Sequence, residues 1–124
     1  MNMLLAVAGG GAVGALLRYW VSHHLHAWPG VGFPWATLYV NVAGSFALGV
    51  VYVLLAERLD VAPEWRGAIA VGLLGALTTF STFSLETLRL FEVGHAGMAI
   101  ANVLANVLAC LASCALGLWL TRAV

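Results

Sequence analysis

Four long apolar segments dominate this chain and limit what it can fold into. They cover residues 3–21, 36–56, 67–91 and 98–120. Each is close to or above the roughly 20 residues that a helix needs to cross a bilayer. Lipid offers the backbone no hydrogen-bond partners, so segments of this kind span it as helices. The sequence therefore predicts an all-α membrane protein with a single four-helix transmembrane domain over residues 1–124.

The composition supports a membrane protein and excludes several other classes. Of the 124 residues, 63% are hydrophobic and only 8% are charged, against about 25% charged in a typical soluble domain. The net charge is zero and lysine is absent, so nothing indicates nucleic-acid binding. The first apolar segment follows no positive charge and is longer than a signal-peptide core, so we expect it to be a retained membrane helix.

Aromatic and loop-forming residues mark the expected ends of the spans. Tryptophans lie near these ends, as in an aromatic belt, at Trp20, Trp28, Trp35, Trp65 and Trp119. The connection between the first two spans is predicted from a cluster of histidine, proline and glycine, namely His23, His24, His26, Pro29, Gly30, Gly32 and Pro34. Within the first span, Gly10 and Gly14 predict close contact with a neighbouring helix.

The arginines are almost evenly divided between the two sides of the predicted membrane domain. Arg58, Arg66 and Arg122 fall on the side of the termini, and Arg18 and Arg89 on the other. Positive charge in short loops normally orients a membrane protein, so this balance predicts insertion in both orientations. Two copies of opposite orientation could then form an antiparallel two-fold dimer.

A polar stretch interrupts the third span at residues 75–86, where six residues carry a hydroxyl or a carboxyl group. At membrane depth such a cluster has to face protein or a water-filled path. Serine and threonine divert backbone hydrogen bonds, which predicts a third helix broken near its middle. Phe80 and Phe83 lie one turn apart, and aromatic rings have positive edges. They either pack in the core or form a place for a small anion.

The second and fourth spans each carry a row of polar residues on one helix face. The rows are Thr37, Asn41 and Ser45, and Asn102, Asn106 and Cys110. Their amides either hold the helix bundle together or line a pathway as donors. Arg18 is a candidate vestibule charge that concentrates anions. No metal cluster and no nucleophile–base pair is apparent, so we expect no enzyme.

These motifs resemble the Fluc/CrcB family of small fluoride channels over essentially the whole chain. The resemblance rests on the glycines and Arg18-Tyr19 of the first span, on 37–41 in the second, and above all on Gly75 and the 78–86 stretch in the third. It implies a passive channel of the bacterial inner membrane that exports fluoride and lowers its toxicity. It also implies an antiparallel, dual-topology homodimer with two pores, each built from both subunits.

The resemblance also implies roles for individual residues. Asn41 would donate to fluoride, with the ring edges of Phe80 and Phe83 beside it. The remaining pore positions would be Ser81, Thr82, Thr37 and Asn106, with Arg18 in the vestibule. Backbone carbonyls of Gly75 and Thr78 would hold a structural sodium ion at the dimer centre. The chain departs from the family pattern at Ala36, where glycine is usual, and at Asn102, Asn106 and Cys110, where tyrosine and serines are usual.

Three alternatives remain open from the sequence. Some relatives work as pairs of different chains, so a heteromeric partner is possible. A proton-coupled small multidrug transporter would need a carboxylate in the first span, which has none. In a purely structural membrane subunit, Asn41→Ala and Phe80→Ala would lower stability alone. In a channel we expect them to lower fluoride flux while the dimer survives.

Overall fold

The computed structural model describes residues 2–25 and 32–124, and within these ranges all regular structure is helical. Four helices are long and apolar enough to cross a membrane: Met3–Leu25, Trp35–Arg58, Pro63–Glu92 and Ala96–Ala123. Each of the four predicted spans falls inside one of them. The predicted all-α fold with four membrane-capable helices is therefore confirmed.

The second, third and fourth of these helices are built from several segments. The first helix is the single segment α1 (Met3–Leu25). The second comprises α2 (Trp35–Tyr52), continued by the π-helical η1 (Val53–Arg58). The third comprises α3 (Pro63–Arg66), the π-helical η2 (Gly67–Leu74), α4 (Gly75–Leu77) and α5 (Phe80–Glu92). The fourth comprises α6 (Ala96–Leu104), the π-helical η3 (Ala105–Ala109) and α7 (Cys110–Ala123).

The first helix is longer than the sequence predicts. It continues through His23 and His24 to Leu25, so assigning these two histidines to the connection is wrong. Inside the helix, His24 Nδ1 donates to Trp20 O at 2.8 Å, which stabilises the last turn. His26, Trp28, Pro29 and Gly30, which we also assigned to the connection or the aromatic belt, lie outside the described residues.

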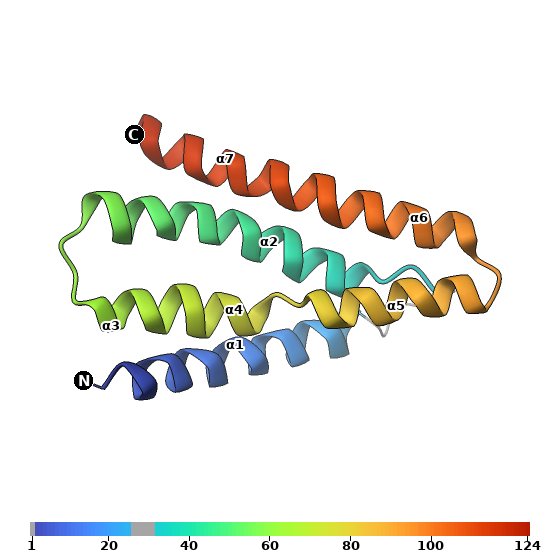
Figure 1. The fold of residues 1–124 in the computed structure, drawn as a ribbon, viewed down its shortest axis with the longest axis horizontal. Helices are drawn as coiled ribbons and strands as arrows, with labels where there is room; N and C mark the ends of the chain where they lie inside the picture. Colours follow the sequence, from blue (N-terminus) through green and yellow to red (C-terminus); the bar gives the residue numbers. More distant parts are fainter. Residues whose placement is uncertain (1, 26–31) are drawn as a thin grey trace.

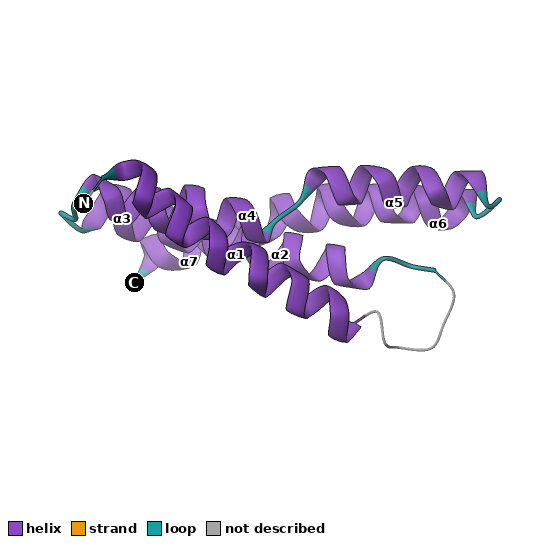
Figure 2. Cartoon of the chain, turned by 90° about the horizontal axis from the view of Figure 1, so that it is seen from below, coloured by secondary structure: helices purple, strands orange, loops and turns teal. Residues whose placement is uncertain are grey.

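The helices pack in pairs that diverge at one end. α1 packs along η2 and α4, α2 along α7, and α5 along α6 (Figure 1). Both termini lie at one end of the molecule, together with the connection that precedes α3, and the turn between α5 and α6 lies at the other. Figure 2 shows that α5 and α6 separate from the ends of α1 and α2 beyond the connection of α4 to α5.

Glycines allow the closest helix contacts. A Cβ atom added at Gly10 or Gly14 would collide with backbone carbonyl groups of η2. The contact of α2 with α7 is built in the same way, with Gly49 against Cys114 O and Gly117 against Phe46 O. In lipid, close backbone packing replaces the hydrophobic drive that associates helices in water. These contacts fix the pairs that surround the polar stretch.

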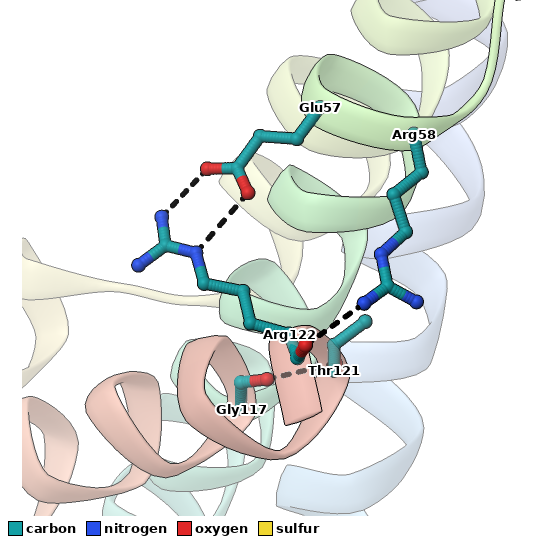
Figure 3. Close-up of polar contacts among 5 residues, drawn as sticks. All are labelled: Glu57, Arg58, Gly117, Thr121 and Arg122. Carbon is teal, nitrogen blue, oxygen red and sulfur yellow. Dashed lines mark hydrogen bonds and ion pairs between the residues drawn. The ribbon is translucent and has the colours of Figure 1, made fainter. Parts of the chain in front are cut away.

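Polar contacts join the ends of η1 and α7 at the end that carries the termini (Figure 3). Arg122 contacts the Glu57 carboxylate through Nη2 at 2.6 Å and through Nε at 3.1 Å. Arg58 Nη2 donates to Arg122 O at 3.0 Å, which satisfies one of the carbonyls that a helix C-terminus leaves unpaired. The ion pair is exposed, so it adds little to stability. Together with the Arg58 contact, it joins η1 to α7 at this end.

Candidate functional site

The backbone leaves the helical conformation between α4 and α5. Thr78 has φ −80° and ψ 154°, and Thr79 has φ −151° and ψ 116°, so both are extended. The amide and hydroxyl of Thr78 both still bond back to Leu74 O, at 3.1 and 3.0 Å. The polar groups of Thr79 have left the helical ladder. At this depth in a membrane protein they need other partners.

The side chain of Asn41 supplies those partners. Its Oδ1 accepts from Thr79 N at 2.8 Å, and its Nδ2 donates to Thr79 O at 3.2 Å. An extended residue can pair both its N–H and its C=O with one neighbour, as strands do in an antiparallel ladder. The carboxamide of Asn41, only 8% exposed, takes the place of such a neighbour. Asn41 therefore holds the extended segment to α2.

Thr79 also organises the start of α5. Its Oγ1 accepts from Thr82 N at 3.2 Å, which makes it the N-cap of the helix. The same hydroxyl donates to Thr82 Oγ1 at 3.0 Å and lies 3.3 Å from Ser81 Oγ. The N-terminus of a helix carries a partial positive charge. The structure places that end at the extended segment, next to Asn41.

A row of buried hydrogen bonds continues from Asn41 into the fourth helix. Asn41 Nδ2 donates to Asn106 Oδ1 at 3.0 Å, and Asn106 Nδ2 donates to Asn102 Oδ1 at 2.9 Å and to Asn102 O at 3.0 Å. Asn102 Nδ2 donates to Thr87 Oγ1 at 2.9 Å, and Thr87 Oγ1 donates to Phe83 O at 2.8 Å. We call the side chains of Asn106, Asn102 and Thr87 the amide row. The row connects η3 and α6 to α5.

An open pocket of about 430 Å³ lies beside the extended segment. Asn41, Phe80, Phe83 and Asn106 all line it, so the structure brings four of the predicted pore residues together. The two rings have centroids 5.3 Å apart and planes inclined by 55°. Phe83 is 7% exposed, whereas Phe80 is 77% exposed. Phe80 therefore presents most of its ring outward from this subunit.

A second pocket of about 260 Å³ contains the predicted vestibule residue Arg18. Thr37 and Thr82 also line it, and Thr79 lines both pockets. The hydroxyl of Thr37 donates to Glu86 Oε1 at 2.9 Å, so its hydrogen is committed to a carboxylate in this state. Ser81 is exposed at the start of α5. Thr79 therefore lies between the two pockets.

Gly75 and Thr78 line the larger pocket, and their carbonyl groups have lost their helical donors. The amide that would bond to Gly75 O in a continuous helix is that of Thr79, which donates to Asn41 instead. The amide that would bond to Thr78 O is that of Thr82, which donates to Thr79 Oγ1. The carbonyl groups of Gly75 and Thr78 are therefore not engaged by the amides that a continuous helix would supply. Backbone carbonyl oxygens can replace the hydration shell of an alkali cation.

Sequence reasoning missed the part played by Thr87. It did single out Asn102, but as one of a row on its own helix and not as a partner of α5. Thr87 lies four residues after Phe83, one turn further along the same face of the third span, and this spacing could have indicated it. Its hydroxyl ends the amide row, 7% exposed, next to the fully buried Asn102.

Comparison with known proteins assigns the chain to a family. A family model described as "CrcB-like protein, Camphor Resistance (CrcB)" matches residues 5–118. A relative from Shewanella amazonensis is 54% identical over 117 residues, which are 94% of each chain. One from Magnetococcus marinus is 48% identical over 118 residues, 95% of this chain and 96% of the relative.

A third relative, from Methylococcus capsulatus, is longer. It is 53% identical over 123 residues, which are 98% of this chain but 54% of the relative, so the chain spans about half its length. Each of the three relatives is named "Fluoride-specific ion channel FluC". The family model and these full-length similarities lead to one conclusion: the chain belongs to the CrcB family.

Proposed function

We propose that this chain forms a passive, fluoride-selective channel of the bacterial inner membrane, through which fluoride leaves the cytoplasm. One observation of the structure carries the proposal. Asn41, Phe80 and Phe83 line a single pocket at the point where the third helix is interrupted. The relatives named as fluoride-specific channels, and the four membrane-capable helices, support the same function. The chain acts as a channel and not as an enzyme.

Fluoride enters through the smaller pocket. The guanidinium group of Arg18 attracts the anion and raises its local concentration. Fluoride is strongly hydrated, so protein donors have to replace its water as it advances. The Thr82 hydroxyl accepts from Thr79 Oγ1, which leaves its own hydrogen for a second partner. Thr79, which borders both pockets, leads the ion from the first to the second.

In the larger pocket, Asn41 provides the donor and the phenylalanines provide ring edges. Both amide hydrogens of Asn41 have acceptors here, Thr79 O at 3.2 Å and Asn106 Oδ1 at 3.0 Å. Fluoride takes the hydrogen from the longer of the two bonds, because a hydrogen bond to an anion is stronger than one to a neutral carbonyl. The positive ring edges of Phe80 and Phe83 then stabilise the ion without binding it tightly.

A second copy of the chain in the opposite orientation completes the pores. The larger pocket is open on one side, and Phe80 and Gly75 are exposed there. A two-fold axis uses the same surface of both copies, so each dimer contains two equivalent pores. The third helix is broken at Thr78 and Thr79 in each copy. Carbonyls of Gly75 and Thr78 from both copies hold a structural sodium ion at the dimer centre.

The function is tested with liposomes that contain this chain alone. Preloaded with potassium fluoride and given valinomycin, they are expected to release fluoride rapidly to an external electrode, and to release chloride no faster than protein-free liposomes. The permeation path is lined by donors and is too narrow for chloride, which gives this selectivity. Proton-coupled efflux of an organic cation without fluoride efflux would instead favour a multidrug transporter.

The antiparallel arrangement is tested by labelling one chain end. Val124 is 98% exposed, so Val124→Cys, with Cys110 and Cys114 replaced by alanine, places a single accessible thiol at the C-terminus. A membrane-impermeant maleimide is expected to label half of the protein from outside intact cells and the rest after permeabilisation. The near balance of the five arginines predicts equal populations. Labelling from one side only would contradict dual topology.

A further inference from the structure

The amide row presents an oxygen, and not a hydrogen, to Asn41. Asn106 Nδ2, which carries two hydrogens, donates to two oxygens of Asn102, Oδ1 at 2.9 Å and O at 3.0 Å. What remains for Asn41 is Asn106 Oδ1, at 3.0 Å from Asn41 Nδ2. Asn106 is 5% exposed and Asn102 is fully buried, so solvent cannot easily replace these partners. In this state Asn106 has no hydrogen to offer an anion.

The direction of every bond in the row is fixed from both ends. At one end, Thr79 N can only donate, so the atom of Asn41 that faces it is Oδ1, and Nδ2 faces Asn106. At the other end, Phe83 O can only accept, so Thr87 Oγ1 donates to it and accepts from Asn102 Nδ2. Amide orientations are normally ambiguous. Here two backbone groups determine the same polarity independently.

We propose that Asn106, Asn102 and Thr87 are positioning residues that hold the Asn41 carboxamide with its donor facing the anion path, and that Asn106 does not itself donate to fluoride. This inference rests on the proposed channel function and changes the role expected of Asn106. Its Oδ1 repels an anion and attracts the Asn41 amide. The ion is thereby confined to the side of Asn41 that faces Thr79. There Asn41 Nδ2 can exchange the longer of its two hydrogen bonds, the one to Thr79 O, for a bond to fluoride.

Buried hydrogen bonds in series strengthen one another. An amide or hydroxyl group that donates its hydrogen becomes polarised, and its oxygen is then a better acceptor for the next group. Removing the Thr87 hydroxyl leaves Asn102 Nδ2 without its acceptor. The Asn102 amide then loses the contact that holds its side chain, and Asn102 Oδ1 becomes a weaker and less firmly placed acceptor for Asn106 Nδ2. Asn106 Oδ1 is in turn held less firmly opposite Asn41 Nδ2. The effect of Thr87 on fluoride thus travels through three side chains.

The test compares Thr87→Val, which keeps the shape but removes the hydroxyl, with Thr87→Ser, which keeps the hydroxyl. Thr121→Val is the matched control, because Thr121 Oγ1 donates to Gly117 O at 2.8 Å as Thr87 does to Phe83 O, but belongs to no row (Figure 3). We expect Thr87→Val to lower fluoride flux per folded channel about fivefold. This is the factor by which the net contribution of one neutral hydrogen bond changes an equilibrium constant. The half-saturating fluoride concentration should rise. Thr87→Ser and Thr121→Val should stay near the wild type.

If the wild-type protein conducts fluoride, two outcomes overturn the proposal. One is that Thr87→Val has the same flux and fluoride affinity as the wild type. The other is that Thr87→Ser loses as much flux as Thr87→Val. Absence of flux in the wild type would refute the channel function instead. As a second criterion, Thr87→Val should change nothing further when added to Asn102→Ser, because the row is already cut. Additive losses contradict a shared row. If Thr87→Val does not fold, Asn102→Ser alone is expected to lower fluoride flux in the same way. Its control is Ser113→Ala, which removes a separate contact with Val42 O.

Discussion

Asn41→Ala is expected to reduce fluoride flux to the level of protein-free liposomes and also to destabilise the folded chain. The substitution leaves Thr79 N, Thr79 O and Asn106 Oδ1 without the partner that they have in the wild type. A buried polar group without a partner costs about 1–3 kcal/mol. Three such groups correspond to a loss of roughly 3 kcal/mol or more. Thermal or denaturant unfolding in detergent measures the loss, and liposome efflux measures the flux.

Ser45→Ala is the matched control for this prediction. Ser45 lies one turn after Asn41 on α2 and lines the same pocket, but it does not hold the extended segment. Its removal should leave stability and flux close to those of the wild type. If Asn41→Ala unfolds at the wild-type temperature, Asn41 does not secure Thr79. The simpler expectation from the sequence, lost flux with an intact dimer, would then hold.

The sequence was sufficient for the architecture because the length and apolarity of a membrane helix dominate all weaker signals. The four predicted spans lie within the four observed helices, and their errors are at the ends, where α1 continues through His23 and His24. The sequence also identified residues that meet in space. Asn41, Phe80 and Phe83 come from two different helices and line one pocket.

The hydrogen-bond partners could not be predicted, because they depend on how each helix is rotated about its axis. Thr37 lines the smaller pocket, and its hydroxyl bonds to Glu86, a partner that the sequence did not indicate. Asn102 and Asn106 were assigned to one face from α-helical spacing, and their side chains do meet there, with Asn106 Nδ2 2.9 Å from Asn102 Oδ1, although Asn106 lies in the π-helical η3. That spacing says nothing of which atom of each amide faces which neighbour. Only the structure shows that Asn106 turns its hydrogens toward Asn102 and its oxygen toward Asn41.

Phe80→Ala separates flux from stability more cleanly than any other substitution at the site. Phe80 is 77% exposed, so its removal takes little packing from this subunit, whereas Phe83 is 7% exposed. Truncating a buried phenylalanine costs about 3–5 kcal/mol, and lost flux in Phe83→Ala would therefore be ambiguous. A ring edge that stabilises the ion by about 1.5 kcal/mol would lower flux roughly tenfold when removed. Fluoride efflux per folded channel measures this loss.

Phe91→Ala provides the comparison, since Phe91 lies on the same helix, is 46% exposed and is remote from the N-terminus of α5. Removing either ring alters a similar lipid- or partner-facing surface, so equal losses in the two variants would point to dimer packing and not to fluoride. A loss confined to Phe80→Ala, with an unchanged elution volume in detergent, requires the ring to act on the ion. Wild-type flux in Phe80→Ala would exclude this ring from the pathway. Asn41 and the positive end of α5 would then be left as the donors that replace the water of fluoride.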